Sequence, residues 1–167
     1  MARVTKDGAD LGILLTLALR GFVDQLHDGL ESRGFSDVRP AFGVIFRALR
    51  DEPLTLTDLA ARLGVTKQAA SKVVDEMEAK RLVRRTASRT DGRAKLLALT
   101  PRGRDAMATA IALGGEIDAQ LREVAGGAKV DTMHRVLEDF VVLAGLGDDL
   151  ASRRSPALWD ESQGART

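Results

Sequence analysis

Apolar residues recur at helical spacing over three long stretches of the chain. The first stretch covers residues 7 to 33, and its first half is apolar on nearly every side. The second covers residues 101 to 125, and the third covers residues 130 to 146, beyond the pair Gly126-Gly127. Helices with this much apolar surface need more than one neighbour to cover them. The pattern therefore predicts three long helices that a single chain does not bury.

The segment after Gly34 has the pattern of a short buried helix. Pro40 suits the first turn of a helix, and residues 51–53 (Asp-Glu-Pro) end the pattern. The apolar stripe between them consists of Phe42, Ile45, Phe46 and Leu49. Residues 54–56 (Leu-Thr-Leu) then predict a small strand.

Two further short helices are predicted, joined by a tight turn at Gly64. Thr57 is expected to cap the first, with Asp58 in its first turn, where the helix dipole favours an acid. Thr66 is expected to cap the second. The first helix turns Leu59, Ala60 and Leu63 inward. The buried side of the second helix holds Ala69, Ala70, Val73, Val74 and Met77. Its opposite side holds Lys67, Gln68, Ser71, Lys72 and Asp75.

Beyond the second short helix the pattern changes to that of a β-hairpin. Residues 82–83 and 96–99 read as two strands, and residues 88–93 read as the loop between them, with Asp91-Gly92 as its turn signal. Thr100 and Pro101 then suit the cap and first position of the next helix.

Two short helices followed by a hairpin is the order of a winged helix-turn-helix. In such a unit the first helix crosses the DNA backbone and the second presents its exposed residues to base edges in the major groove. The small residue Ala60 and the turn residue Gly64 allow the two helices to pack closely. The predicted fold class is therefore mainly α with a small β-wing, a winged helix-turn-helix flanked by long helices.

Charge is unevenly distributed along the chain. The formal net charge is only +1, but the stretch from Arg62 to Arg104 holds twelve Lys or Arg and four Asp or Glu, a net charge of +8. The rest of the chain carries a net charge of −7. Most charge runs are simply solvated faces, but a basic hairpin beside a helix-turn-helix also suits phosphates and the minor groove.

Composition excludes several kinds of chemistry. The chain has no cysteine, which removes disulfides, thiolate metal sites, cysteine catalysis and thiol redox sensing. The longest apolar run, Leu11–Leu19, is shorter than the roughly 20 residues of a membrane span, so no membrane association is expected. We expect a cytoplasmic protein.

The sequence of the predicted helix-turn-helix and hairpin resembles the MarR family of bacterial regulators. Residues 59–78 (LAARLGVTKQAASKVVDEME) are similar to that family's helix-turn-helix core. Residues 82–85 (LVRR), 91–93 (DGR) and 99–103 (LTPRG) resemble its wing and the entry to the next helix. The likeness covers residues 54 to 105 in motif and the whole chain in helix order.

The resemblance implies a homodimer that binds double-stranded DNA at a palindromic site. It implies intertwined dimerisation helices in residues 1–34 and 101–147, and a DNA-binding region in residues 35–100. Residues 148–167 are rich in charge and small polar residues, which predicts a flexible tail. The DNA-contacting residues that the resemblance implies are Thr66, Lys67, Gln68, Ser71, Lys72, Arg89, Asp91 and Arg93. Among these, Arg93 matches the wing-tip arginine that enters the minor groove, and Asp91 matches the acid that steadies the wing.

The resemblance also implies a ligand-responsive repressor, although activation stays open. A small aromatic or phenolic effector is expected between the dimer helices and the winged region. The chain departs from the family at Ser88, where an acid is common, at Gly92, where a second arginine is common, and at Ala70, where a branched aliphatic residue is usual. These departures affect the expected wing contacts more than the fold.

Two alternatives remain at this stage. The first is a winged-helix adaptor that binds protein and not DNA. The second is a small enzyme built around the only histidines, His27 and His134, each of which has a glutamate four residues later. Such i,i+4 partners are common on helices, and no nucleophile–base pair or phosphate-binding glycine loop accompanies them. We expect no enzyme activity, no cofactor and no metal.

Overall fold

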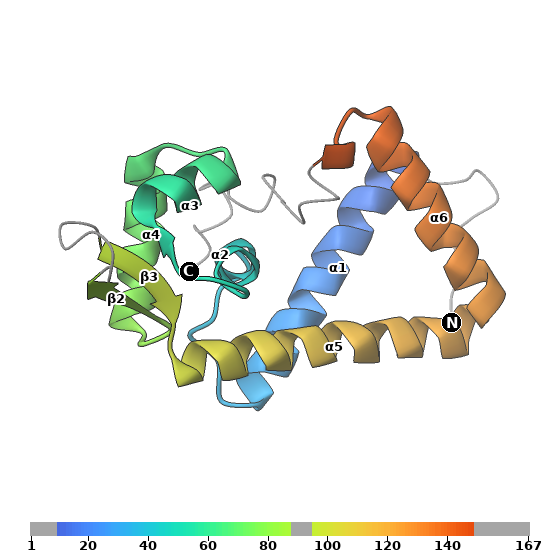
Figure 1. The fold of residues 1–167 in the computed structure, drawn as a ribbon. Coiled ribbons are helices and arrows are strands. Elements are labelled where there is room, and N and C mark those ends of the chain that lie inside the picture. The colour runs from blue at the N-terminus through green and yellow to red at the C-terminus, as the bar shows by residue number, and fades with distance from the viewer. Residues whose placement is uncertain (1–9, 88–94, 149–167) are drawn as a thin grey trace.

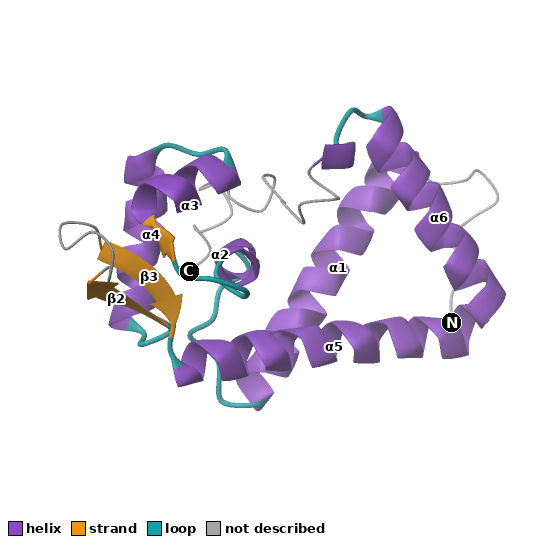
Figure 2. Ribbon diagram, viewed as in Figure 1, coloured by secondary structure: helices purple, strands orange, loops and turns teal. Residues whose placement is uncertain are grey.

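The computed structural model describes residues 10–87 and 95–148, which form a small winged part and a frame of long helices (Figure 1). Helices α1 (Leu11–Ser32), α5 (Pro101–Ala125) and α6 (Gly127–Leu143) make the frame. The winged part consists of α2 (Phe42–Ala48), β1 (Leu54–Thr55), α3 (Leu56–Leu63), α4 (Lys67–Ala79), β2 (Val83–Ala87) and β3 (Lys95–Leu99). Helices dominate and the strands are confined to one corner (Figure 2), which confirms the predicted fold class.

The small sheet has three antiparallel strands in the order β1-β3-β2. In the hairpin, Val83 pairs with Leu99 and Ala87 pairs with Lys95. The short strand β1 lies on the other side of β3, where Leu54 pairs with Leu97. The sequence predicted this short strand but not its partner, because the pairing joins segments more than forty residues apart.

One apolar core fills the space between α2, α3, α4 and the sheet. The predicted stripe of α2 is fully inside it, with Phe42 and Ile45 0% exposed. Leu30 of α1 and Leu113 of α5 join the same core, so the winged part is fastened to the frame. Burial of such side chains stabilises the fold by about 1.5–3 kcal/mol each.

Local capping explains where helix α3 of the winged part begins. The hydroxyl of Thr55 accepts a hydrogen bond from the backbone N–H of Asp58 (3.1 Å), so α3 begins at Leu56. The prediction that Thr57 caps this helix was therefore wrong, because Thr55 has the extended backbone that a cap needs. Helix α2 begins at Phe42, two residues later than the predicted start at Pro40.

Helix α5 begins as predicted, with the hydroxyl of Thr100 accepting from the N–H of Gly103 and proline at its first turn. Gly103 is required here for space, because a Cβ atom at this position would lie 2.0 Å from the carbonyl oxygen of Leu82. The break between α5 and α6, predicted at Gly126 and Gly127, consists of Gly126 alone. Its φ of 92° favours glycine. Gly127 is already helical, so α6 begins three residues earlier than predicted.

The three frame helices keep much of their apolar surface exposed. Helix α1 crosses α5, and α6 folds back from the far end of α5 (Figure 1). Leu17 on α1 is 60% exposed and Leu143 on α6 is 83% exposed. No helix among residues 10–87 and 95–148 combines the length and apolar character of a membrane span. Apart from Asp148, the predicted tail lies outside the described residues.

Candidate nucleic-acid interface

Helix α4 is held in place by its own cap and by the turn from α3. The hydroxyl of Thr66 accepts a hydrogen bond from the backbone N–H of Ala69 (3.2 Å), as predicted. Gly64 adopts a φ of 67°, and the N–H of Val65 bonds to the carbonyl of Ala60 (3.1 Å). These contacts fix the angle between α3 and α4 with local bonds, which is the geometry of a helix-turn-helix.

One side of α4 faces the core and the other faces outward. Ala70, Val74 and Met77 are completely buried, whereas the predicted inward residues Ala69 and Val73 are only half-buried. The helix is anchored by three residues at i, i+4 and i+7. Its remaining faces are therefore free to present polar side chains.

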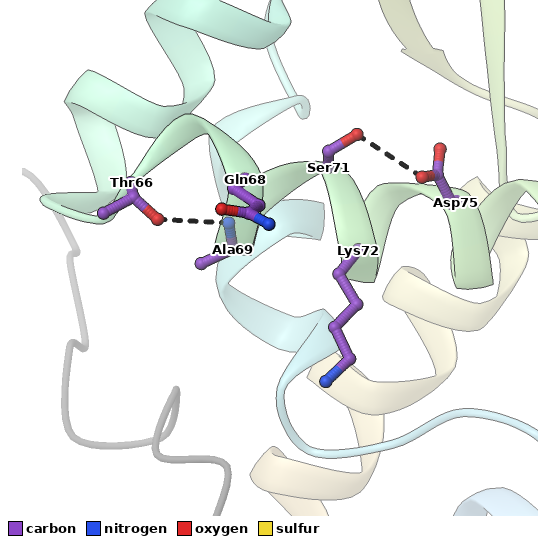
Figure 3. Close-up of a pocket in the computed structure, with 6 residues that line it drawn as sticks. All are labelled: Thr66, Gln68, Ala69, Ser71, Lys72 and Asp75. Carbon is purple, nitrogen blue, oxygen red and sulfur yellow. Dashed lines mark hydrogen bonds between the residues drawn. The ribbon is translucent and has the colours of Figure 1, made fainter.

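The outward side of α4 brings together five of the predicted DNA-contacting residues. Thr66, Gln68, Ser71 and Lys72 line one hollow, together with Ala69 and Asp75 (Figure 3). Figure 3 shows these side chains along the helix, with Thr66 at its start and Lys72 extended away from the ribbon. Lys67 is exposed at the first position of the same helix. Amide, hydroxyl and ammonium groups in such a row suit base edges and phosphates.

The predicted wing contacts cannot be placed in the same way. Arg89, Asp91 and Arg93 lie outside the described residues. The strands that flank them are described, and their antiparallel register from Val83–Leu99 to Ala87–Lys95 is that of the predicted hairpin.

Two of the arginines counted along the sequence are neutralised within the fold by acids from outside the basic stretch. Arg62 pairs with Glu52 (3.1 Å) and donates to the carbonyl of Ala48 (3.0 Å). Arg102 pairs with Asp37 (2.7 Å). The net charge counted along the sequence therefore overstates the basic surface that this region offers to DNA.

Sequence reasoning missed a second feature of α4, which is its link to the hairpin. Arg85 on β2 donates to Asp75 (2.6 Å) and to Glu78, both on α4. The hydrogen bond to Asp75 is the main cause that raises the pKa of Arg85 above its usual value. The spacing of Asp75 and Glu78 at i and i+3 was the one available signal, because it places both acids on one helix face.

The two histidines lie on different helices, His27 on α1 and His134 on α6. His134 on α6 lies 3.2 Å from Asp118 on α5, and Asp118 also accepts from Arg122 (2.6 Å). Arg122 reaches across the corner to Asp131 (2.7 Å) and lowers the pKa of that carboxyl group. His27 has a buried Nδ1 atom without a hydrogen-bond partner among the described residues. Within this part of the chain, no group of three or more His, Cys, Asp or Glu could hold a metal ion.

Comparison with known proteins agrees with this geometry. Residues 39–94 match the model of the MarR family. No curated protein sequence matches the chain. Among solved structures, a MarR family protein of Mycobacterium tuberculosis in complex with salicylic acid is 28% identical, with a TM-score of 0.57 over 81% of this chain and 99% of that one.

Two further solved structures share the fold. The transcriptional repressor CouR, bound to a 23-mer DNA duplex, is 23% identical with a TM-score of 0.64, over 84% of this chain and 99% of that one. MarR of E. coli, in its apo form, is 21% identical with a TM-score of 0.60, over 81% of this chain and 99% of that one. Residues 39–94 thus match the model of the MarR family, and the chain has the fold of these solved structures.

Proposed function

We propose that this protein is a cytoplasmic transcriptional repressor that binds a palindromic operator in double-stranded DNA as a homodimer. The observation that carries the proposal is the outward side of α4, where Thr66, Gln68, Ser71 and Lys72 line one hollow. A helix docked in the major groove uses such residues for base edges and phosphates. Gln68 suits an adenine edge, and Lys67 or Lys72 suits a guanine or a phosphate.

Homodimerisation is supported by the exposed apolar surface of the frame helices. Leu17 and Ile13 on α1, Val124 on α5, and Val142 and Leu143 on α6 are all more than half exposed. Monomeric proteins rarely leave contiguous apolar surface of this extent in water. We assign dimerisation to residues 1–34 and 101–147, and DNA binding to residues 35–100.

In addition to the contact of α4 with the major groove, we propose that the hairpin contacts DNA. Arg93 enters the minor groove in this proposal, Arg89 binds phosphate and Asp91 steadies the loop. The strand ends that flank these residues, Ala87 on β2 and Lys95 on β3, are both exposed, whereas Val83 and Leu99 at the other end of the hairpin are buried. Exposed strand ends at this position suit contact of the hairpin with DNA beside the major groove.

Regulation by a small aromatic acid is the final part of the proposal. A relative that is 28% identical was solved with salicylic acid. An effector that binds between the frame helices and the winged part alters the spacing of the two copies of α4. Because two half-sites lie about one helical turn apart, a change in that spacing lowers operator affinity.

Selection of bound duplexes from a random pool tests the proposal directly. We expect a palindromic consensus, and an affinity for it that falls steeply with salt because several phosphates are neutralised. The adaptor alternative predicts no enrichment and no salt-dependent binding of duplex DNA. Titration of the selected complex with salicylate and related phenolic acids then measures the effector response.

A further inference from the structure

The link between β2 and α4 is built from one guanidinium group and two carboxylates. The Nη2 atom of Arg85 lies 2.6 Å from an oxygen of Asp75, and its Nη1 atom donates to Glu78. The side chain of Arg85 is 26% exposed, so this link is partly shielded from water. A planar guanidinium is suited to hold two carboxylates at once, whereas an ammonium group acts as a single point charge.

This link lies beside the last buried position of the hairpin, because Arg85 pairs with Leu97 on β3, which is 1% exposed. Val83, at the start of β2, is 2% exposed and belongs to the core. Arg84 is exposed, Arg85 and Thr86 are half-buried, and Ala87 is exposed. The base of the hairpin is therefore fixed by burial, and Arg85 continues the attachment to α4 by charge.

The same link reaches the outward side of the recognition helix. Asp75 lines the hollow with Gln68, Ser71 and Lys72 (Figure 3). It also accepts a hydrogen bond from the hydroxyl of Ser71 (3.3 Å). A carboxylate on a surface that faces DNA repels phosphates unless a cation compensates it, and Arg85 provides that cation.

We propose that Arg85 is a positioning residue, which holds the hairpin at a fixed distance from α4 through Asp75 and Glu78, so that hairpin and recognition helix bind DNA as one rigid unit. The inference rests on the proposed function, because it concerns the DNA-bound protein. In this inference Arg85 acts through its contacts with the two carboxylates of α4 and does not contact a DNA phosphate. The free protein then carries the hairpin already oriented, which reduces the ordering cost on binding.

A mutant cycle separates positioning from direct DNA contact. Operator affinity is measured for Arg85→Gln and for the same change in an Asp75→Asn/Glu78→Gln background, with the duplex selected from the random pool. If Arg85 acts by positioning, Arg85→Gln lowers operator affinity about tenfold in the wild-type background. In the double-variant background it lowers affinity about twofold or less, because the two carboxylates that Arg85 binds are already absent. The Arg85→Lys variant keeps the charge but loses most of the affinity, because lysine does not bridge both acids.

A phosphate contact predicts different results from the same measurements. The loss would be equal in both backgrounds, Arg85→Lys would retain affinity, and the salt slope would fall by about 1 for Arg85→Gln. Those results overturn the inference, as does wild-type affinity in Arg85→Gln. The matched control is Arg84→Gln, which removes the same charge from the exposed neighbouring position. We expect its effect to be the same in both backgrounds.

Amide hydrogen exchange of the free protein gives a readout that does not depend on DNA. We expect Arg85→Gln and Arg85→Lys to speed exchange in β2 and β3 relative to wild type, while Arg84→Gln leaves it unchanged. Unchanged exchange in the Arg85 variants overturns the inference, even where the wild-type protein binds its operator. If the wild-type protein binds no duplex, the proposed function fails, and the exchange experiment alone decides whether Arg85 holds the hairpin.

Discussion

The winged part and the frame of long helices differ in how completely one chain buries them. Phe46 in α2 is 2% exposed, while Phe140 in α6 is 45% exposed. The first lies in a core closed on several sides by helices and a sheet, and the second lies on a helix with few neighbours. Two phenylalanines of one chain therefore have opposite environments.

Under the proposed function, this difference assigns DNA binding and dimerisation to two separate regions of the chain. The winged part reaches a buried core and capped helices with its own residues and a few from α1 and α5. In α6, Val130 is the one completely buried residue among those described. In the proposed homodimer, the frame is thus the part whose stability depends on a second copy, and variants in the two regions should respond differently.

The largest effect is expected from a charge placed on the frame. Leu17→Glu should weaken dimerisation by about a thousandfold or more, because each copy buries an unpaired carboxylate at a cost of about 2–5 kcal/mol. Analytical ultracentrifugation measures the dissociation constant. Leu17→Met, which conserves volume, should leave the protein dimeric. An unchanged mass for the glutamate variant would show that α1 lies outside the interface.

A large effect on folding is expected from the core of the winged part. Phe46→Ala should lower the free energy of unfolding by about 3–5 kcal/mol, because it leaves a cavity in a closed core. Urea denaturation measures the change. Phe140→Ala is the matched substitution in the frame, and its main effect should be on dimer dissociation. Equal losses of stability at both positions would remove the contrast between the two regions.

A smaller loss is expected where α5 joins the two regions. Gly103→Ala should destabilise the fold by about 3 kcal/mol, because the new Cβ atom meets the backbone carbonyl of Leu82 and that backbone must shift. Gly43→Ala in α2 is the control, since its Cβ atom meets nothing within 4 Å. That change should be neutral or stabilise the helix by up to about 1 kcal/mol. Thermal unfolding compares the two variants.

Changes on the outward side of α4 should affect DNA binding and leave the frame unaffected. Gln68→Ala should relax base preference at one operator position by about 1–3 kcal/mol. Lys72→Ala should weaken binding to all sequences and reduce the salt slope by about 1. Competition binding with single-base operator variants distinguishes these patterns. Unaltered affinity and preference in both variants would exclude α4 as the recognition helix.

The smallest effect is expected at the turn between α4 and β2. Arg81 adopts a φ of 58°, which L-residues with a side chain rarely occupy. Arg81→Gly should therefore raise the free energy of unfolding by about 0.5–1 kcal/mol. Urea denaturation detects this change, and Lys80→Gly, at a position with negative φ, should instead destabilise the protein.

Most of the local structure was predictable because its causes lie within a few residues. Thr66 and Thr100 cap helices as expected, and Gly64 forms the turn before α4. The error at Thr57 arose because two threonines two residues apart both suit a cap. Only the backbone conformation of Thr55 distinguishes them.

The candidate site was predictable in part for the same reason. Helical periodicity placed Gln68, Ser71 and Lys72 on one side of α4 without knowledge of the fold. It did not reveal that Asp75 and Glu78 share Arg85, because that contact depends on how a strand packs against the helix. Charge counting also failed to show that Arg62 is neutralised by Glu52.

The amino-acid order alone determined the existence of the helices, the caps at Thr66 and Thr100, the turn at Gly64 and the side of α4 that faces outward, since each depends on neighbours within one or two helical turns. Only the tertiary structure decided the pairing of β1 with β3, the close approach of Gly103 to Leu82 and the link from Arg85 to α4. These contacts join segments that are distant along the chain or belong to different elements. Their geometry exists only once the apolar core has brought those elements together.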